Sequence, residues 1–336
     1  MTGPKVGVAL GSGSSRGWAH IGVLQALGDA GIPVHCVAGT SIGAYVGAIY
    51  AAGDLDRLAE FALSMDWKKV LSYMDLVFPK SGFIQGKRIR ELLAINTAAT
   101  DFRDLHLPTA VIATDLYTGE RLEIRSGPLF PAIRASVSVP GVVTPVKVGS
   151  RWLVDGGLVD PVPVSAVRNL GADVVIAVDL TTTLVSKIHP REKPSDHHPE
   201  EISELISSEK RALIHRLLVQ YGETSERLRR IFNQWVRREE KSPHLLDIMG
   251  STVNIMQKQI AEMNLSASPP DVLIQPQLGD LKMFDFDQAE RSIREGYDRT
   301  LEQVPRIKAL LREETARPVR PTGDAVPAGT TPARPQ

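Results

Sequence analysis

One pentapeptide has the residue types and spacing of an activated serine. Gly39-Thr40-Ser41-Ile42-Gly43 matches G-x-S-x-G, in which a serine sits on a sharp turn between a strand and a helix. The small glycines leave the hydroxyl uncovered, and the free N–H groups at the start of the following helix favour a developing negative charge. An apolar run precedes the pentapeptide and an Ala-rich helical pattern follows it, so the context fits a nucleophile. The alternative is an ordinary turn.

A glycine-rich stretch, residues 11–17 (GSGSSRG), follows another apolar run and has two interpretations. A dinucleotide-binding loop needs a third glycine where Arg16 stands, and an acidic residue at the end of the second strand, which this chain lacks. A Walker-type phosphate loop needs Gly-Lys-Ser/Thr, which does not follow. An oxyanion hole needs only backbone N–H groups near the nucleophile. The loop alone does not choose, but its surroundings favour the oxyanion hole.

A serine nucleophile needs a base, and an aspartate is better placed than any histidine. Asp155 ends the apolar run WLVD and precedes Gly156-Gly157, although an isolated Asp-Gly-Gly is also common in turns. His20 falls in the first predicted helix, where a packing or capping role is commoner. The other histidines considered do not follow a predicted strand: His189, His197, His198, His215 and His244.

The apolar pattern predicts an α/β layer fold that would position these stretches. Helices are predicted at 17–30 and 44–53, and a closing amphipathic helix at 287–314. Buried strands with little alternation favour parallel pairing. The predicted strands are 5–10, 34–38, 109–116, 121–127, 152–157, 173–180 and 271–276.

Taken together and in this order, GSGSSRG, GTSIG and DGG resemble the patatin-like phospholipase family. The segments 113–120, 135–146 and 155–180 are also similar to that family, and the pattern is closest to its bacterial, neuropathy-target-esterase-like branch of small proteins. The resemblance implies a three-layer α/β sandwich with a mostly parallel central sheet over residues 1–316. Independently of the resemblance, the helical and charge-rich pattern of residues 186–265 predicts a mostly helical insertion that interrupts the α/β alternation.

The resemblance also implies a Ser-Asp dyad without histidine. Ser41 would be the nucleophile, and Asp155 would accept its proton and later activate water. The residues implied for the oxyanion loop are Gly11, Ser12 and Gly13, braced by Arg16. The accompanying motif glycines are Gly39, Gly43, Gly156 and Gly157.

Two residues depart from the family pattern. Ser12 stands where many members have a glycine, which would strain the loop if that position needs a positive φ. Pro161 stands where the family often has asparagine, and could alter the turn that carries the base while leaving Asp155 intact.

Composition limits the partners of the protein. Of its 336 residues, 39 are Lys or Arg and 39 are Asp or Glu, so no net charge points to nucleic acid. The single cysteine, Cys36, excludes an intramolecular disulfide and is expected to fill the core. We expect no metal and no cofactor, because no residues show ligand spacing. Without a leader or a spanning segment, we expect a cytoplasmic protein, including a peripheral position at the inner membrane surface.

The helical insertion raises the question of membrane contact. Residues 205–241 interleave arginines with large apolar side chains, which suits a helix packed on the domain, a helix lying in a lipid interface, or a homo-oligomer contact. Residues 245–265 are predicted to form a buried helix. Residues 317–336 are rich in Pro, Thr and Ala and are predicted to be a disordered tail.

These observations predict a serine acyl hydrolase for phospholipid, lysophospholipid or related lipid esters. An acyltransferase would use the same acyl-enzyme and is a first alternative. A non-catalytic regulatory protein on the same fold is a second.

Overall fold

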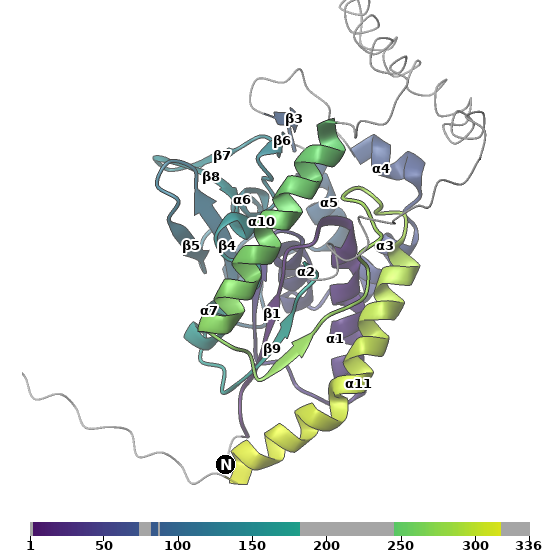
Figure 1. The fold of residues 1–336 in the computed structure, drawn as a ribbon, viewed down its shortest axis with the longest axis vertical. Helices are drawn as coiled ribbons and strands as arrows, with labels where there is room; N and C mark the ends of the chain where they lie inside the picture. Colours follow the sequence, from purple (N-terminus) through teal and green to yellow (C-terminus); the bar gives the residue numbers. More distant parts are fainter. Residues whose placement is uncertain (1–2, 74–81, 87, 182–244, 317–336) are drawn as a thin grey trace, which may run out of the picture.

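The structure, a computed structural model, describes residues 3–73, 82–86, 88–181 and 245–316. A central sheet of eight strands organises this part of the chain (Figure 1). Its order is β10-β9-β1-β2-β4-β8-β7, and β5 pairs with β4. These strands are β1 (Val6–Leu10), β2 (Cys36–Thr40), β4 (Thr109–Asp115), β5 (Arg121–Ile124), β7 (Val146–Val148), β8 (Arg151–Asp155), β9 (Val174–Val178) and β10 (Val272–Ile274). Two short strands, β3 (Gly82–Ile84) and β6 (Gly141–Val143), pair separately.

The sheet is mostly parallel, as predicted. Every pair from β10 to β4 is parallel, whereas β4–β5, β4–β8 and β8–β7 are antiparallel. Leu10 pairs with Gly39, so the loop after β1 and the turn after β2 leave the sheet side by side. Asp155 of β8 pairs with Ala113 of β4, and these two strands run antiparallel. The sequence did not predict this antiparallel approach of β8.

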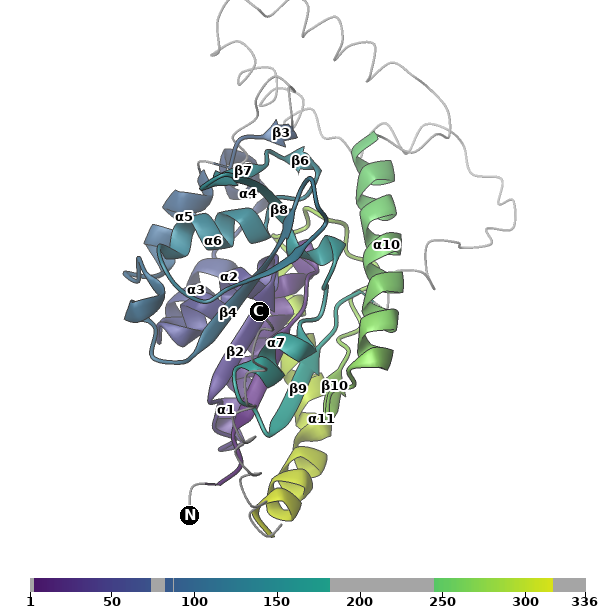
Figure 2. The ribbon, with the colours of Figure 1, turned by 90° about the vertical axis from the view of Figure 1, so that its left-hand side faces the viewer.

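Helices cover both faces of the sheet and give the predicted three layers (Figure 2). One face packs on α1, α2, α3 and α11 through the larger apolar side chains of the strands, such as Val8 and Val37. The other face packs on α7 and on Ala261 of α10 through smaller side chains, such as Ala9 and Ala38. The helices are α1 (Ala19–Asp29), α2 (Ile42–Ala51), α3 (Leu55–Leu63), α4 (Trp67–Tyr73), α5 (Arg88–Asn96), α6 (Leu129–Ser136), α7 (Val164–Asn169), α10 (Leu245–Ala267) and α11 (Ala289–Ala316).

Small side chains explain how closely α7 approaches its face of the sheet. A Cβ on Gly7 would lie 2.2 Å from Val167 Cγ1 of α7, so only glycine fits there. Cys36 lies in the same cluster, and burial raises the pKa of its thiol to about 11. The thiol is therefore neutral core filling, as expected.

Helix α10 differs from its prediction. The sequence predicted a buried helix over 245–265, and a helix is present, but only one stripe of it faces inward. Buried residues recur as Val253, Gln257 and Ala261, while Ile255 is 51% exposed and Met263 70% exposed. The prediction of full burial was wrong because α10 lies along one side of the molecule (Figure 2), where one side of the helix packs inward and the other is exposed. Residues 182–244, which hold most of the predicted insertion, and the predicted tail 317–336 lie outside the described residues.

Candidate active site

Ser41 occupies a strained turn between β2 and α2. Its backbone has φ 57° and ψ −123°, a conformation that costs about 1 to 3 kcal/mol for a residue with a side chain. The flanking glycines are required by close approach: a Cβ on Gly39 would lie 2.3 Å from Gly43 O, and one on Gly43 would lie 2.1 Å from Leu10 O. The G-x-S-x-G spacing therefore follows from a turn so tight that its two ends touch.

Asp155 lies directly opposite the serine. Ser41 Oγ donates a hydrogen bond of 2.6 Å to Asp155 Oδ2, and the Gly157 N–H donates to Asp155 Oδ1 at 2.7 Å. The aspartate is 1% exposed. A Cβ on Gly156 would lie 2.4 Å from Ile112 O, so the turn after the aspartate needs glycine to pass the neighbouring strand. The two residues named as nucleophile and base are thus brought together.

Burial changes the acidity of Asp155. Desolvation raises the pKa of its carboxyl to about 7, although the Ser41 hydroxyl and the Gly157 N–H, both of which favour the carboxylate, oppose the rise. A carboxylate with this pKa holds a proton far more readily than an ordinary aspartate. It is therefore suited to take a proton from a hydroxyl near neutral pH.

The glycine-rich loop requires a correction. The Gly11 N–H donates to Val178 O at 3.0 Å and the Ser12 N–H donates to Pro161 O at 2.8 Å, so neither faces an incoming oxyanion. Within the described residues, the N–H groups of Gly13 and Ser14 donate no hydrogen bond. The N–H groups that the loop can offer to an oxyanion are thus one position further along than expected.

Ser12 does not have the positive φ that would have strained the loop. The residue of the loop with a positive φ, of 53°, is Ser14. The Ser14 hydroxyl donates to Met283 O at 2.6 Å, which holds this unusual backbone in place. Pro161 leaves the Asp155 turn intact, and its carbonyl accepts the bond from Ser12. Both departures from the family pattern are therefore accommodated by specific contacts.

Arg16 braces the loop from inside the protein. It is 1% exposed, and its Nε donates to Gly13 O at 3.0 Å while Nη2 donates to Asn254 Oδ1 of α10 at 3.3 Å. Burial lowers the pKa of the guanidinium to about 10 and the charge of Asp179 opposes this, so Arg16 remains a cation at neutral pH.

His20 holds the same loop and is not placed as a base. Its Nε2 lies 2.7 Å from Gly11 O, and burial lowers the pKa of the imidazole to about 4. The neutral ring therefore donates Nε2–H to that carbonyl. His35 accepts a hydrogen bond from the Val6 N–H, at the opposite end of β1 from the loop. The histidines at 189, 197, 198, 215 and 244 lie outside the described residues.

An apolar cavity of about 200 Å³ opens beside Ser41. Ser14 and Ser41 both line it, so the free end of the glycine-rich loop and the nucleophile face the same space. The remaining walls are almost entirely aliphatic and aromatic, and include Tyr45, Ile84, Leu92, Val139, Val143 and Phe284. Such a cavity suits a hydrocarbon chain whose carbonyl end lies at the serine.

Sequence reasoning missed several side chains that fix the site. The Ser41 N–H donates to Ser136 Oγ at 2.8 Å, and that hydroxyl donates to Ile112 O at 2.6 Å, which ties the nucleophile turn to α6 and β4. The Asp155 N–H donates to Ser138 O. Both serines belong to the 135–146 segment whose resemblance was noted, which was the available signal, but their partners could not be identified from it.

Helix α10 also contributes to the site. Ser12 Oγ donates to Gln257 Oε1 at 3.4 Å, and a Cβ on Gly157 would lie 2.3 Å from Gln257 Nε2. The inward stripe of α10 thus touches both the glycine-rich loop and the turn after Asp155. Polar side chains such as Gln257 on this Met-rich helix were the available signal, but the sequence analysis assigned the helix to the core.

Two further observations concern metals and membranes. In residues 3–73, 82–86, 88–181 and 245–316, no three His, Cys, Asp or Glu side chains gather as metal ligands. Over the same ranges, every helix falls short of the length and apolarity that crossing a bilayer would need. The membrane or oligomer contact predicted for 205–241 falls outside the described residues and stays a prediction.

Comparisons with known proteins agree with the motifs. A family model described as patatin-like phospholipase matches residues 8–168. The chain is similar to an uncharacterized NTE family protein of Mycobacterium tuberculosis, 40% identical over 177 residues that make up 53% of this chain and 49% of that protein. It is also similar to lysophospholipase NTE1 of Coccidioides immitis, 34% identical over 186 residues, 54% of this chain and 12% of that one. The chain thus spans about half or less of the length of these curated relatives.

Proposed function

Because residues 8–168 carry a patatin-like phospholipase domain, we propose that this chain is a serine-dependent acyl hydrolase of lipid esters. The observation that carries the proposal is the 2.6 Å hydrogen bond from Ser41 Oγ, which lines an apolar cavity, to the buried Asp155. Ser41 is the nucleophile and Asp155 the general base. The lysophospholipase name of one relative supports the same substrate class.

The geometry supports a two-step reaction. Ser41 Oγ attacks the ester carbonyl while its proton moves to Asp155 Oδ2, and the carbonyl electrons move onto the oxygen. The oxyanion accepts hydrogen bonds from the Gly13 and Ser14 N–H groups and from the N–H of Ile42, which follows the nucleophile at the start of α2. Collapse of this intermediate expels the alcohol, which takes the proton from Asp155.

Hydrolysis of the acyl-enzyme repeats these steps with water. Asp155, again a carboxylate, removes a proton from water as its oxygen attacks the acyl carbon. The second tetrahedral intermediate expels Ser41, which recovers its proton from Asp155, and the fatty acid leaves. Since the aspartate contacts the serine directly, no histidine is needed between them.

The cavity supports the proposal that the protein recognises one acyl chain of its substrate. Its apolar walls exclude charge, so the polar remainder of a phospholipid or lysophospholipid would stay outside, towards solvent. We therefore propose lysophospholipids and phospholipids as substrates, with the acyl chain in the cavity and the ester carbonyl at Ser41.

Labelling with a fluorophosphonate and product analysis test this function. The wild type should be labelled at Ser41 and should release fatty acid from lysophosphatidylcholine, and Ser41→Ala should lose both. Ser64→Ala is a matched control, because Ser64 lies on the surface at the end of α3. Transfer of the acyl group to an added alcohol in preference to water would indicate an acyltransferase instead. A wild type that is neither labelled nor active would refute the proposal and leave the non-catalytic alternative.

A further inference from the structure

Three consecutive carbonyls after the base turn accept hydrogen bonds from three different parts of the site. Val159 O accepts from Asn264 Nδ2 of α10 at 2.9 Å, and Asp160 O accepts from Thr40 Oγ1 at 2.8 Å. Pro161 O accepts from the Ser12 N–H at 2.8 Å. The 159–161 segment therefore contacts α10, the residue preceding the nucleophile, and the glycine-rich loop.

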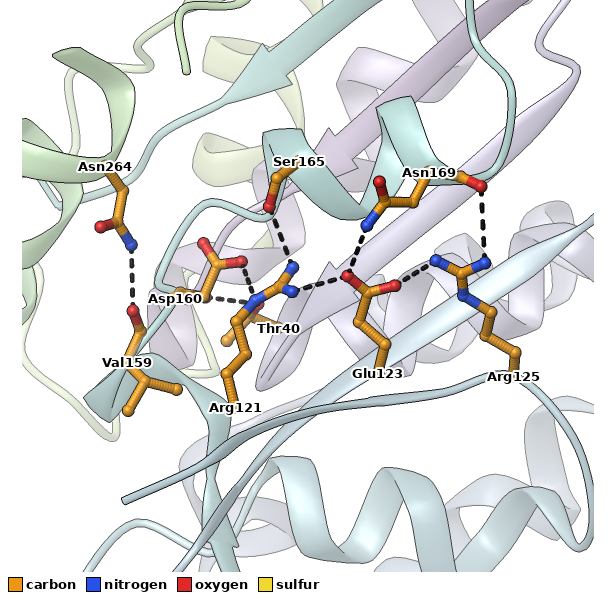
Figure 3. Close-up of polar contacts among 9 residues, drawn as sticks. All are labelled: Thr40, Arg121, Glu123, Arg125, Val159, Asp160, Ser165, Asn169 and Asn264. Atoms are coloured by element: carbon orange, nitrogen blue, oxygen red, sulfur yellow. Dashed lines mark hydrogen bonds and ion pairs between the residues drawn. The ribbon is translucent and has the colours of Figure 1, made fainter. Parts of the chain in front are cut away.

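The side chain of Asp160 anchors this segment. Asp160 is 3% exposed, and its Oδ2 accepts from Arg121 Nε of β5 at 2.6 Å (Figure 3). Arg121 is itself held by Glu123 Oε1 at 2.6 Å and by Ser165 Oγ of α7 at 3.2 Å. These hydrogen bonds hold the guanidinium between β5 and α7, with its Nε directed at Asp160.

The chemistry of this pair suggests a role in geometry more than in stability. The Asp160 side chain is buried, whereas that of Arg121 is 28% exposed. Bringing the carboxylate out of water costs about as much as its attraction to the guanidinium returns, so an apolar contact would often serve stability equally well. A guanidinium instead fixes the orientation of the carboxylate, because its N–H groups lie in one plane and form short hydrogen bonds. Burial raises the pKa of the Asp160 carboxyl and Arg121 opposes the rise, which keeps the carboxylate available to accept that bond.

The pair does not touch the reacting atoms. Asp160 lies in the segment that follows the turn of Asp155, and its N–H donates to Gly156 O at 2.9 Å within that turn. Movement of residue 160 would therefore shift the base turn, the Thr40–Ser41 peptide and the Ser12 N–H together. Such shifts matter, since a misplacement of about 1 Å can reduce a reaction rate about 100-fold.

We propose that Asp160 and Arg121 are positioning residues, which hold the 159–161 segment so that nucleophile, base and oxyanion loop stay in register. This inference rests on the proposed function. It assigns to β5 and α7, which do not reach the cavity, an influence on catalysis that acts through three backbone carbonyls.

Four variants and two matched controls test it. Asp160→Asn and Arg121→Gln each remove one charge of the pair, and Arg121→Lys keeps the charge but not the planar guanidinium. Thr40→Val removes a single hydroxyl at nearly constant volume and keeps the test valid if a charge variant fails to fold.

The controls alter the same residue types away from the segment. Arg125 pairs with Glu123 at the far end of the network, so Arg125→Gln removes an arginine that does not contact residues 159–161 (Figure 3). Thr109 Oγ1 donates to Leu107 O at the opposite end of the sheet from Ser41, so Thr109→Val removes a comparable hydroxyl.

The measurements are kcat and KM on a short soluble ester, the rate of fluorophosphonate labelling of Ser41, and thermal unfolding of each variant. We expect Asp160→Asn and Arg121→Gln to lower kcat and the labelling rate about 10- to 100-fold with KM nearly unchanged. Thr40→Val should show a smaller loss of the same kind, and Arg121→Lys should recover part of the activity lost in Arg121→Gln. Both controls should keep the wild-type kcat at temperatures where all the variants are folded.

The outcomes separate this inference from the proposed function. If wild-type Ser41 is labelled but the folded pair variants and Thr40→Val label at the wild-type rate, the positioning role is refuted and the proposed function stands. If the two controls lose as much kcat as the pair variants, the effect is general destabilisation and the inference is refuted. If the wild type is not labelled at all, the proposed function fails and the inference fails with it.

Discussion

The pH dependence of ester hydrolysis provides the most direct test of Asp155 as the base. Only the carboxylate can take the proton of Ser41, and burial raises the pKa of this group to about 7. Activity should therefore rise with pH through about 7 and level off above pH 8. At pH 5, about one molecule in a hundred would carry the ionised base, so kcat/KM should fall about 100-fold from its plateau.

The same shift has the opposite effect on stability. The pKa of Asp155 is higher in the folded protein than the 3.8 of an unperturbed aspartate, so the folded state binds this proton more tightly. Its contribution to stability is then fully present below pH 3.8 and is lost as the pH rises to about 7. At about 1.4 kcal/mol for each tenfold change in proton affinity, the loss is of the order of 4 kcal/mol. Asp155→Asn should remove this pH-dependent loss while lowering kcat by at least about 100-fold.

The assay is the initial rate of p-nitrophenyl butyrate hydrolysis between pH 5 and 9, with fluorophosphonate labelling over the same range and thermal unfolding at each pH. Asp115→Asn is a suitable control, because Asp115 is also buried but the N–H groups of Thr118 and Tyr117 lower the pKa of its carboxyl. It should leave the midpoint of the activity profile in place. A flat wild-type profile between pH 5 and 8, or an Asp155→Asn variant with wild-type labelling, would refute the reasoning.

Four further predictions follow from the site. Gly43→Ala should greatly reduce the yield of folded, labelled protein, since its Cβ would lie 2.1 Å from Leu10 O; normal thermal unfolding would contradict this. His20→Ala should lower the melting temperature but keep kcat within about tenfold and leave the pH midpoint unchanged, because the neutral ring only holds Gly11 O; a loss as large as that of Asp155→Asn would indicate a histidine base. Val143→Trp, which fills the cavity wall, should lower kcat/KM for dodecanoyl esters about tenfold relative to butanoyl esters, and an unchanged ratio would place the acyl chain elsewhere. Hydrolysis should be insensitive to EDTA, and inhibition reversed by a divalent ion would contradict the metal-free mechanism.

Local sequence was informative where short-range sterics decide the structure. The strands before the glycine-rich loop and before Ser41, and the helices after them, were located within about two residues, because buried apolar runs broken by glycine leave few alternatives. The resemblance based on three ordered motifs agrees with the family match over residues 8–168. The smaller elements, such as β3, β6 and α4 to α6, were not predicted, because short segments are stabilised by packing more than by their own periodicity.

The assignment of the oxyanion donors shows where motif reasoning stops. Motif spacing could not tell that the N–H groups of Gly11 and Ser12 are already bonded to Val178 and Pro161. Those partners come from β9 and from the segment after the base turn, both more than a hundred residues away in the chain. A backbone N–H is available for catalysis only when its surroundings leave it unpaired, and that is a property of the fold.

The sequence by itself determined which residue types stand at the ends of the strands: a serine between two close-packed glycines, an aspartate before two more, and a glycine-rich loop. Tertiary structure decided what these groups do to one another. The antiparallel approach of β8 sets Asp155 within 2.6 Å of Ser41, across 114 positions of the chain, and burial there raises its pKa to about 7. The contacts of Asp160, Arg121 and α10 with the site likewise come from distant segments. Glycine permits turns and close backbone approaches that residues with a Cβ cannot adopt, and this local effect can be recognised in sequence. Distance, burial and pairing depend instead on segments that meet only in the folded chain.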